Sequence, residues 1–208
     1  MAKVLVACEE SQIVCKAFRD KGHEAYSCDL EDCSGGHPEW HFKQNVLPLL
    51  NLSWDLVIAH PPCTYLTNAG VMHLHSVKSK NGVLPKIHGE ERWVLMEKAC
   101  EFFNAFKNCA PKVCIENPIP HKYAREKIGK YTQVVQPWMF GHMETKATCL
   151  WLENLPKLTP TNDVKEEMML LPKKERQRIH YIGNKKDRAK IRSKTFQGLA
   201  TALADQYG

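Results

Sequence analysis

The sequence predicts an α/β protein in which helices cover both faces of a mostly parallel sheet. Short apolar runs alternate along the chain with segments of helical periodicity. The inner runs, such as residues 56–59, are continuously apolar, as expected of strands that are buried on both faces. The length of 208 residues suits one compact unit, so we expect a single domain spanning residues 1–208.

The first half of the chain alternates between strand and helix. Residues 3–8 form a short apolar run, and residues 10–21 form a helix-like segment that stops before a glycine. Residues 24–29 make a second strand, and the polar residues 31–40 then form a loop. Residues 54–60 make a further apolar strand, which two prolines end.

The second half continues this alternation. Residues 90–107 have the periodicity of an amphipathic helix that packs on the sheet. Its apolar face consists of Trp93, Met96, Cys100, Phe103 and Phe106. Residues 111–117 are a buried strand and residues 121–130 a helix, and later strands are expected at 131–137 and 145–153. Residues 71–89, which are rich in His, Lys and Gly, are expected to form a long loop after Cys63.

Composition favours a soluble, cytoplasmic protein with reduced thiols. No apolar stretch approaches the roughly 20 residues needed to cross a bilayer, and the N-terminus lacks the apolar block of a secretory signal. The nine cysteines are an odd number, and several lie inside apolar runs. We therefore expect free core thiols instead of a disulfide framework.

Positive charge is concentrated in residues 173–194. This segment holds ten Lys and Arg against two acidic residues, a net charge of +8, whereas the remaining chain is close to neutral at −2. Such a patch is typical of a protein that binds a polyanion, although a solvated surface helix would have the same charge.

Candidate chemistry lies where strands end, because ligands of open α/β sheets bind beyond the carboxyl ends of the strands. Cys63 directly follows Pro61 and Pro62, which restrict the backbone and end the strand. Taken alone, Cys63 would more often be a small buried hydrophobe than a nucleophile. Glu116, followed by Asn117 and a proline, adds a carboxylate at the end of what should be a neighbouring strand.

A thiol and a carboxyl group in this arrangement suit chemistry on a pyrimidine. The ring is a poor electrophile until its N3 is protonated, which a glutamate in a dry pocket can do if burial raises its pKa. The thiol can then attack carbon 6, so that carbon 5 becomes nucleophilic and can take a methyl group.

The order PPC and then ENP, on an alternating α/β chain, resembles the cytosine carbon-5 DNA methyltransferase family, and its small bacteriophage and prophage members most of all. The resemblance implies a Rossmann-like methyltransferase fold, S-adenosyl-L-methionine as cofactor, and transfer of a methyl group to a flipped-out cytosine in double-stranded DNA. It also implies that Cys63 is the nucleophile, that Glu116 binds N3 and the exocyclic amine of the base, and that Asn117 holds the turn in shape. Protection of DNA from restriction would be the biological purpose.

Two further segments carry the resemblance. Residues 141–148 (GHMETKAT) fall on a family strand with one glutamine and two arginines, where this chain has Glu144, Lys146 and Thr148. Lys146 keeps the positive charge but lacks the planar fork of arginine, so its contacts with the base or the DNA backbone should differ. The C-terminal residues 193–208 resemble the helix that closes the cofactor pocket.

The resemblance places the cofactor at the ends of the first strands. Asp29 would bind the ribose hydroxyls, although a carboxylate at a strand end is often only a turn-forming residue. Asn45 stands where the family favours an aspartate near the adenine, and Pro61 would border the site. The turn after the first strand, which holds Cys8 and Glu9, has no glycine, so its approach to the methionine moiety should differ.

Target recognition would fall to the short basic segment at about residues 153–193. Its candidate DNA-binding residues, with Lys146 and Thr148, are Arg176, Arg178, Lys185, Lys186, Arg188 and Arg192. These side chains could contact guanine edges, but phosphate contacts are the more common use of such residues. The segment is small for this family, so we expect short or relaxed specificity.

Three alternatives remain open from the sequence. The same chemistry could act on RNA or on a free pyrimidine nucleotide, and a degenerate fold could bind nucleic acid without catalysis. A zinc site could also form in the loop after the second strand. Its ligands would be Cys28, Cys33, His37 and His41. The wide spacing of the two cysteines argues against zinc.

Overall fold

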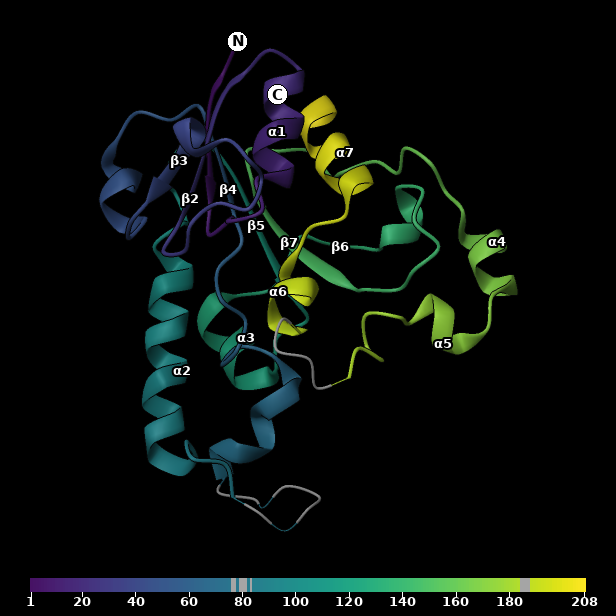
Figure 1. Ribbon diagram of the computed structural model, residues 1–208. Helices are drawn as coiled ribbons and strands as arrows, with labels where there is room; N and C mark the ends of the chain where they lie inside the picture. The colour runs from purple at the N-terminus through teal and green to yellow at the C-terminus, as the bar shows by residue number, and fades with distance from the viewer. Residues whose placement is uncertain (76–77, 79–81, 83, 184–187) are drawn as a thin grey trace.

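The computed structural model describes residues 1–208 except residues 76–77, 79–81, 83 and 184–187 (Figure 1). The fold is built on one sheet of seven strands in the order β3-β2-β1-β4-β5-β7-β6. The strands are β1 (Lys3–Ala7), β2 (Glu24–Asp29), β3 (His41–Lys43), β4 (Leu56–Ala59), β5 (Lys112–Pro118), β6 (Gln133–Val135) and β7 (Thr148–Glu153). The first five strands in this order are parallel, and β7 runs antiparallel to both β5 and β6.

This topology confirms the predicted α/β class with a mostly parallel sheet. The run β3-β2-β1-β4-β5 has the strand order of doubly wound, Rossmann-like sheets. The order reverses between β1 and β4, and in such sheets ligands bind at that switch point.

Helices cover both faces of the sheet, as predicted. The α-helices are α1 (Ile13–Asp20), α2 (Gly89–Asn104), α3 (Lys122–Ile128), α4 (Lys165–Leu170), α5 (Lys173–Arg176), α6 (Arg188–Ser193) and α7 (Gln197–Tyr207). The 3-10 helices are η1 (Pro38–Trp40), η2 (Leu47–Asn51), η3 (Asn68–His75) and η4 (Pro137–Met139). Helices α1 and α7 pack against each other on one face, while α2 and α3 lie together away from them (Figure 1).

The alternation of side chains along β1 separates two cores. Val4 and Val6 belong to the core beneath α1 and α7, whereas Leu5 and Ala7 belong to the core beneath α2 and α3. All four side chains are fully buried, and burying a Val or Leu side chain contributes about 1.5–3 kcal/mol. The continuous apolar run therefore reflects burial on both faces of the sheet.

Helix α2 presents the predicted apolar face. Met96, Cys100 and Phe103 are buried, Trp93 is partly buried, and Phe106 is buried just beyond the helix end. All nine cysteines lie within the described residues and are free thiols, as predicted. Among the described residues, none of the helices has the length and apolar character that crossing a bilayer requires.

Three local expectations were wrong. Helix α1 begins at Ile13 and not near residue 10, because residues 8–12 form a turn. The expected loop after Cys63 begins as the 3-10 helix η3, and part of its remainder lies outside the described residues. Residues 141–147 are not in a strand, so only Thr148 of the GHMETKAT segment belongs to β7.

Candidate active site

The PPC and ENP segments lie side by side at the ends of β4 and β5. These strands are parallel neighbours, with Ala59 opposite Ile115, so the residues that follow each strand leave the same edge of the sheet. The side-chain amide of Asn117 donates a hydrogen bond of 2.7 Å to the carbonyl oxygen of Pro61. Asn117 is only 1% exposed, and this buried bond fastens the two segments to each other.

A histidine that the sequence analysis did not single out pairs with the glutamate of ENP. His60 Nδ1 lies 2.8 Å from Glu116 Oε2, and the side chains are 14% and 10% exposed, respectively. The backbone N–H of His60 donates to the carbonyl oxygen of Ala7 at 2.9 Å, which fixes the residue at the switch point between β1 and β4. His60 Nε2 is buried and makes no hydrogen bond to another described residue.

This ion pair reverses the expected protonation of Glu116. Burial favours a raised pKa, but the hydrogen bond and charge of His60, with the charge of Lys146, lower the pKa of Glu116 overall. The pKa of His60 is correspondingly raised, because Glu116 and Glu9 outweigh the effect of burial. The predicted raised pKa of Glu116 is therefore wrong for the free protein.

Cys63 is half-buried, and three charged groups act on its thiol. Burial raises the pKa of its thiol, and the negative charge of Glu116 acts in the same direction. Lys146 and Arg192 oppose these effects with their positive charges. The free protein consequently holds a protonated thiol, and cationic side chains stand close enough to stabilise a thiolate once it forms.

Lys146 reaches this edge because β7 runs antiparallel to β5. Pro118 pairs with Thr148 in that ladder, so the residues that precede β7 arrive beside the end of β5. Lys146 Nζ donates to the carbonyl oxygen of Lys194 at 3.2 Å and lies 5.8 Å from the ring centroid of Phe196. Thr148 is buried at 4% exposure and donates to the Lys146 carbonyl, so its side chain does not lie on a surface open to DNA.

Three of the predicted cofactor residues line one cavity of about 280 Å³. Cys8 follows β1, Asp29 ends β2 and Asn45 lies after β3, and all three meet there with Pro62. The apolar lining is supplied by Leu30, Val46, Leu47 and Phe102. Pro61, the fourth predicted residue, is buried with its carbonyl bonded to Asn117, and its neighbour Pro62 borders the cavity instead.

The fifth predicted cofactor residue, Glu9, faces helix α1. Its carboxylate accepts hydrogen bonds from the backbone N–H groups of Val14 at 2.6 Å and Cys15 at 3.1 Å, so it satisfies the free amides at the start of the helix. The turn needs no glycine because Cys8 and Gln12 adopt left-handed backbone conformations, with φ of 59° and 57°. A carboxylate that caps the helix and two residues in left-handed conformations thus stand where the family that the sequence resembles has a glycine turn.

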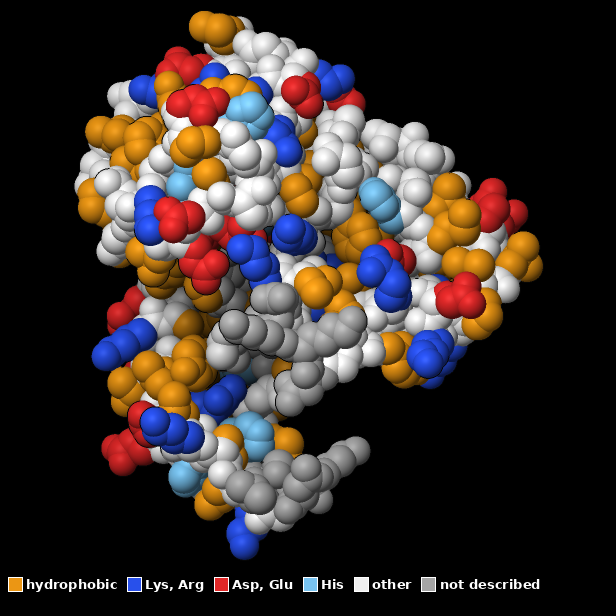
Figure 2. All heavy atoms as spheres, viewed as in Figure 1, with side chains coloured by type: hydrophobic (Ala, Val, Ile, Leu, Met, Phe, Trp, Pro, Cys, Tyr) orange, Lys and Arg blue, Asp and Glu red, His pale blue; other side chains and the backbone are white. Residues whose placement is uncertain are grey.

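The basic segment returns to the active-site edge through α6. In the described part of the chain, Lys190 Nζ lies 3.4 Å from Glu10 Oε2 and 4.0 Å from Glu31 Oε2, and the residue after Lys194, Thr195, donates to Glu116 Oε2 at 3.4 Å. Figure 2 shows Lys and Arg side chains over α5 and α6, interrupted by acidic ones.

The predicted DNA-binding arginines fall into two groups. Arg176 donates to the carbonyl oxygen of Met169, and Arg178 forms an ion pair of 2.6 Å with Glu144 while remaining 61% exposed. Arg188 and Arg192 are half-buried in α6, near the active-site edge. Lys185 and Lys186 lie outside the described residues.

The four side chains of the possible zinc site do not share a contact with one another. The Cys28 thiol donates to the carbonyl oxygen of Gln44, and His41 bonds to Ser27 and to the carbonyl oxygen of Glu31. His37 stacks on Trp40 and pairs with Glu39, and Cys33 is a half-buried thiol. Within the residues that the structure describes, no group of three or more His, Cys, Asp or Glu is arranged to hold a metal ion.

Sequence reasoning missed two residues that contact Glu116. His60 could have been noticed, since a histidine that ends an apolar strand beside PPC is unusual. Thr195 gave no such signal, because it lies 79 residues away from Glu116 in the chain. Comparison of the chain with models of known protein families and with curated proteins found no match.

Proposed function

We propose that this chain is a DNA (cytosine-5-)-methyltransferase that uses S-adenosyl-L-methionine and forms a covalent bond between Cys63 and the target base. The observation that carries the proposal is the juxtaposition of Cys63 with the His60–Glu116 pair at neighbouring strand ends, next to a cavity at the switch point. The order of PPC and ENP adds the family resemblance.

The residues that line the cavity suit the adenosine end of the cofactor. Asp29 supplies a carboxylate for the ribose hydroxyls, Asn45 supplies an amide, and Leu30 and Phe102 supply apolar surface for the adenine. A volume of about 280 Å³ is close to the lower end of ordinary ligand sites, which begin at roughly 300 Å³. When bound, the cofactor supplies an electrophilic methyl group.

The chain's own residues would prepare the cytosine for this transfer. The Glu116 carboxylate accepts a hydrogen bond from the exocyclic amine, and together with His60 it holds a proton that can be shared with N3 of the ring. The Cys63 thiol gives its proton to solvent, and the thiolate, stabilised by Lys146 and Arg192, adds to carbon 6 while N3 takes up the shared proton. Carbon 5 becomes nucleophilic and is methylated, after which loss of its proton expels the thiolate.

Positive charge around this edge supports a polyanionic substrate. An enzyme that acts on a base inside a duplex must extrude that base, and Lys and Arg side chains compensate the phosphate charge. Arg192 of α6 acts on the Cys63 thiol with its positive charge, and Arg178 is 61% exposed. The short span of this basic segment suits a small recognition surface.

The proposal is tested by incubating the chain with labelled S-adenosyl-L-methionine and, in separate reactions, double-stranded DNA, RNA or dCMP. We expect label to transfer to DNA, and bisulfite sequencing to locate it on cytosine. Transfer only to RNA or only to dCMP would show that this molecule, and not DNA, is the substrate. DNA binding without transfer to any of the three would identify a non-catalytic protein.

The nucleophile is tested with Cys63→Ala. We expect this variant to lose methyl transfer while it still binds S-adenosyl-L-methionine in a calorimetric titration, because the cavity is lined by other residues. Cys109→Ala, which removes another half-buried thiol, is the matched control and should keep its activity. Methyl transfer by Cys63→Ala would eliminate the covalent mechanism.

A further inference from the structure

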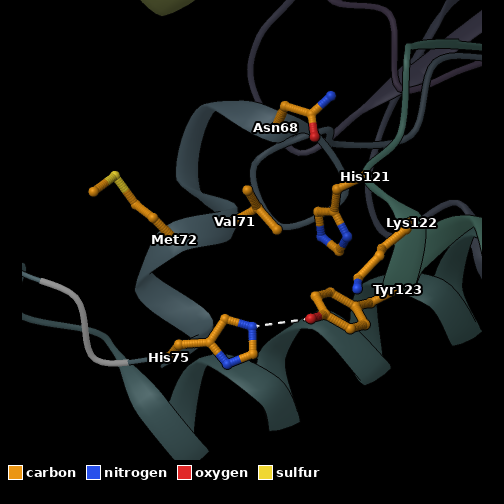
Figure 3. Close-up of a pocket in the computed structure, with 7 residues that line it drawn as sticks. All are labelled: Asn68, Val71, Met72, His75, His121, Lys122 and Tyr123. Carbon is orange, nitrogen blue, oxygen red and sulfur yellow. Dashed lines mark hydrogen bonds between the residues drawn. The ribbon is translucent and has the colours of Figure 1, made fainter.

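A second cavity, of about 410 Å³, lies between η3 and the start of α3 (Figure 3). Asn68, Val71 and His75 line it from η3, and His121, Lys122 and Tyr123 line it from the opposite side. Figure 3 shows His75 and Tyr123 next to each other, joined by a hydrogen bond. The methyltransferase chemistry proposed above uses none of these residues.

The walls of this cavity are held by specific contacts. His75 Nε2 lies 3.1 Å from the hydroxyl oxygen of Tyr123, and Trp93 of α2 supports the tyrosine ring from another side at a centroid distance of 4.9 Å. His121 Nδ1 accepts the backbone N–H of Ala124 at 3.1 Å, and His121 Nε2 lies 3.0 Å from the carbonyl oxygen of Tyr65. The aromatic platform is therefore fixed before any ligand arrives.

The cavity is also tied to the candidate active site. Its two walls continue directly from the reactive segments, because Asn68 lies five residues after Cys63 and His121 lies five residues after Glu116. Five residues span at most about 17 Å. The backbone N–H of His121 donates to the carbonyl oxygen of Leu66 at 2.9 Å, which joins the walls beside that site.

The composition of the walls suits an aromatic ring attached to an anionic chain. Residues 68–75 and 121–123, which supply the two walls, contain no Asp or Glu. The exposed Lys122 places Nζ over the face of the Tyr123 ring, 4.6 Å from its centroid, so a base that stacks on this face would displace the ammonium group toward its phosphate. Aromatic side chains beside cations are what proteins use to stack the bases of single strands while holding the phosphates.

We propose that this cavity receives a nucleobase of the substrate strand close to the target cytosine, stacked on Tyr123 with Lys122 facing the adjacent phosphate. The proposal deepens the function proposed above and rests on it for the identity of the strand. Because stacking uses the face of the base, the subsite should tolerate several bases. It would hold the strand while the target is extruded.

The test measures binding of a fluorescent single-stranded oligonucleotide that contains one cytosine, without cofactor and without methyl transfer. We expect Tyr123→Ala to bind it about 10-fold more weakly, the effect of losing one stacked base, whereas Tyr123→Phe keeps the ring and should bind like the unchanged protein. His75→Ala alters an exposed wall residue and should weaken binding about threefold with the fold intact. Lys122→Gln tests the phosphate contact in the same binding assay. Its charge control is Lys130→Gln, which removes an exposed lysine elsewhere on the protein.

An abasic site moved along the oligonucleotide identifies the occupant. At one offset from the cytosine it should weaken binding to the unchanged protein by about 10-fold, yet cause no further loss in Tyr123→Ala. Unchanged binding by both Tyr123→Ala and His75→Ala, or equal sensitivity at every offset, would overturn the subsite. If pocket-dependent binding persists but no methyl transfer is found, the proposed function fails and the subsite stands. If methyl transfer is found but the cavity variants bind normally, the proposed function stands and the subsite fails.

Discussion

Replacing His60 by alanine should destabilise the fold in a way that depends on pH. At 2.8 Å and an effective dielectric constant of about 20, the attraction between His60 and Glu116 is about 6 kcal/mol before the cost of burial is subtracted. Removing one partner of a buried ion pair typically costs about 3–5 kcal/mol. Since both side chains keep some exposure, we expect His60→Ala to lose about 3 kcal/mol of unfolding free energy.

The pKa shifts define where this stabilisation is present. The folded-state pKa of Glu116 is lowered from 4.5, so its contribution is present above pH 4.5 and is lost as the pH falls through the folded value. The folded-state pKa of His60 is raised from 6.5, so its contribution is complete below pH 6.5 and is lost as the pH rises through the folded value. The pair therefore stabilises the protein fully between these limits.

Urea unfolding at about pH 5.5 and about pH 9 measures the effect. The difference between the unchanged protein and His60→Ala should be largest at the lower pH and smaller at the higher one. The other groups that face the His60–Glu116 pair are Glu9, Lys146, Thr195 and nearby thiols, so their titration must also be considered. Burial raises the pKa of the Cys149 thiol to about 12, so this group stays protonated throughout the comparison.

His60→Gln is the matched variant, because an amide can donate a hydrogen bond to Glu116 but carries no charge. We expect it to lose less stability than His60→Ala and to show little change in that loss between the two pH values. A difference for His60→Ala that keeps its full size at about pH 9 would refute the assignment of a charged His60–Glu116 pair.

Three more predictions concern stability and are checked by thermal or urea unfolding. Cys8→Gly should be about 1 kcal/mol more stable than Cys8→Ala, because only glycine adopts a φ of 59° without strain; the opposite order would argue against the strained turn. Asn117→Ala should cost about 2 kcal/mol, because the Pro61 carbonyl loses its buried donor, and an unchanged midpoint would contradict that bond. Gly198→Ala should cost about 3 kcal/mol, because its Cβ would overlap the backbone of Phe140, whereas Gly183→Ala, which has open space, should change stability by less than about 0.5 kcal/mol.

The fold class could be predicted because burial leaves a local pattern. The apolar run that contains Val57 and the helical spacing of Met96 and Cys100 each indicate one element from neighbouring residues alone. The direction of β7 could not be predicted, because its side chains alternate in the same way whichever way the strand pairs. Strand β3 could not be predicted either, because three residues, none of them fully buried, give too short a pattern.

In the candidate site, too, the features that local sequence motifs mark could be predicted, and those that depend on distant segments could not. Cys63 and Glu116 could be selected because each lies in a recognisable short motif. Their protonation states could not be predicted, because these depend on Lys146, Arg192 and His60, which the fold brings together from distant segments. Glu9 likewise could not be separated from the cofactor residues until its bonds to the α1 backbone were known.

The reversed direction of β7 limits how the basic segment could be exchanged between proteins with this fold. Strand β7 delivers Lys146 to the active edge but ends at Glu153, about 20 Å away at the opposite edge, so the following chain must travel back along the body. Leu158 is buried on that path and exchanges two hydrogen bonds with Gln133. A graft spanning residues 153–193 would remove this anchored return path, whereas a graft confined to residues 173–193 would replace the basic segment and leave that path in place.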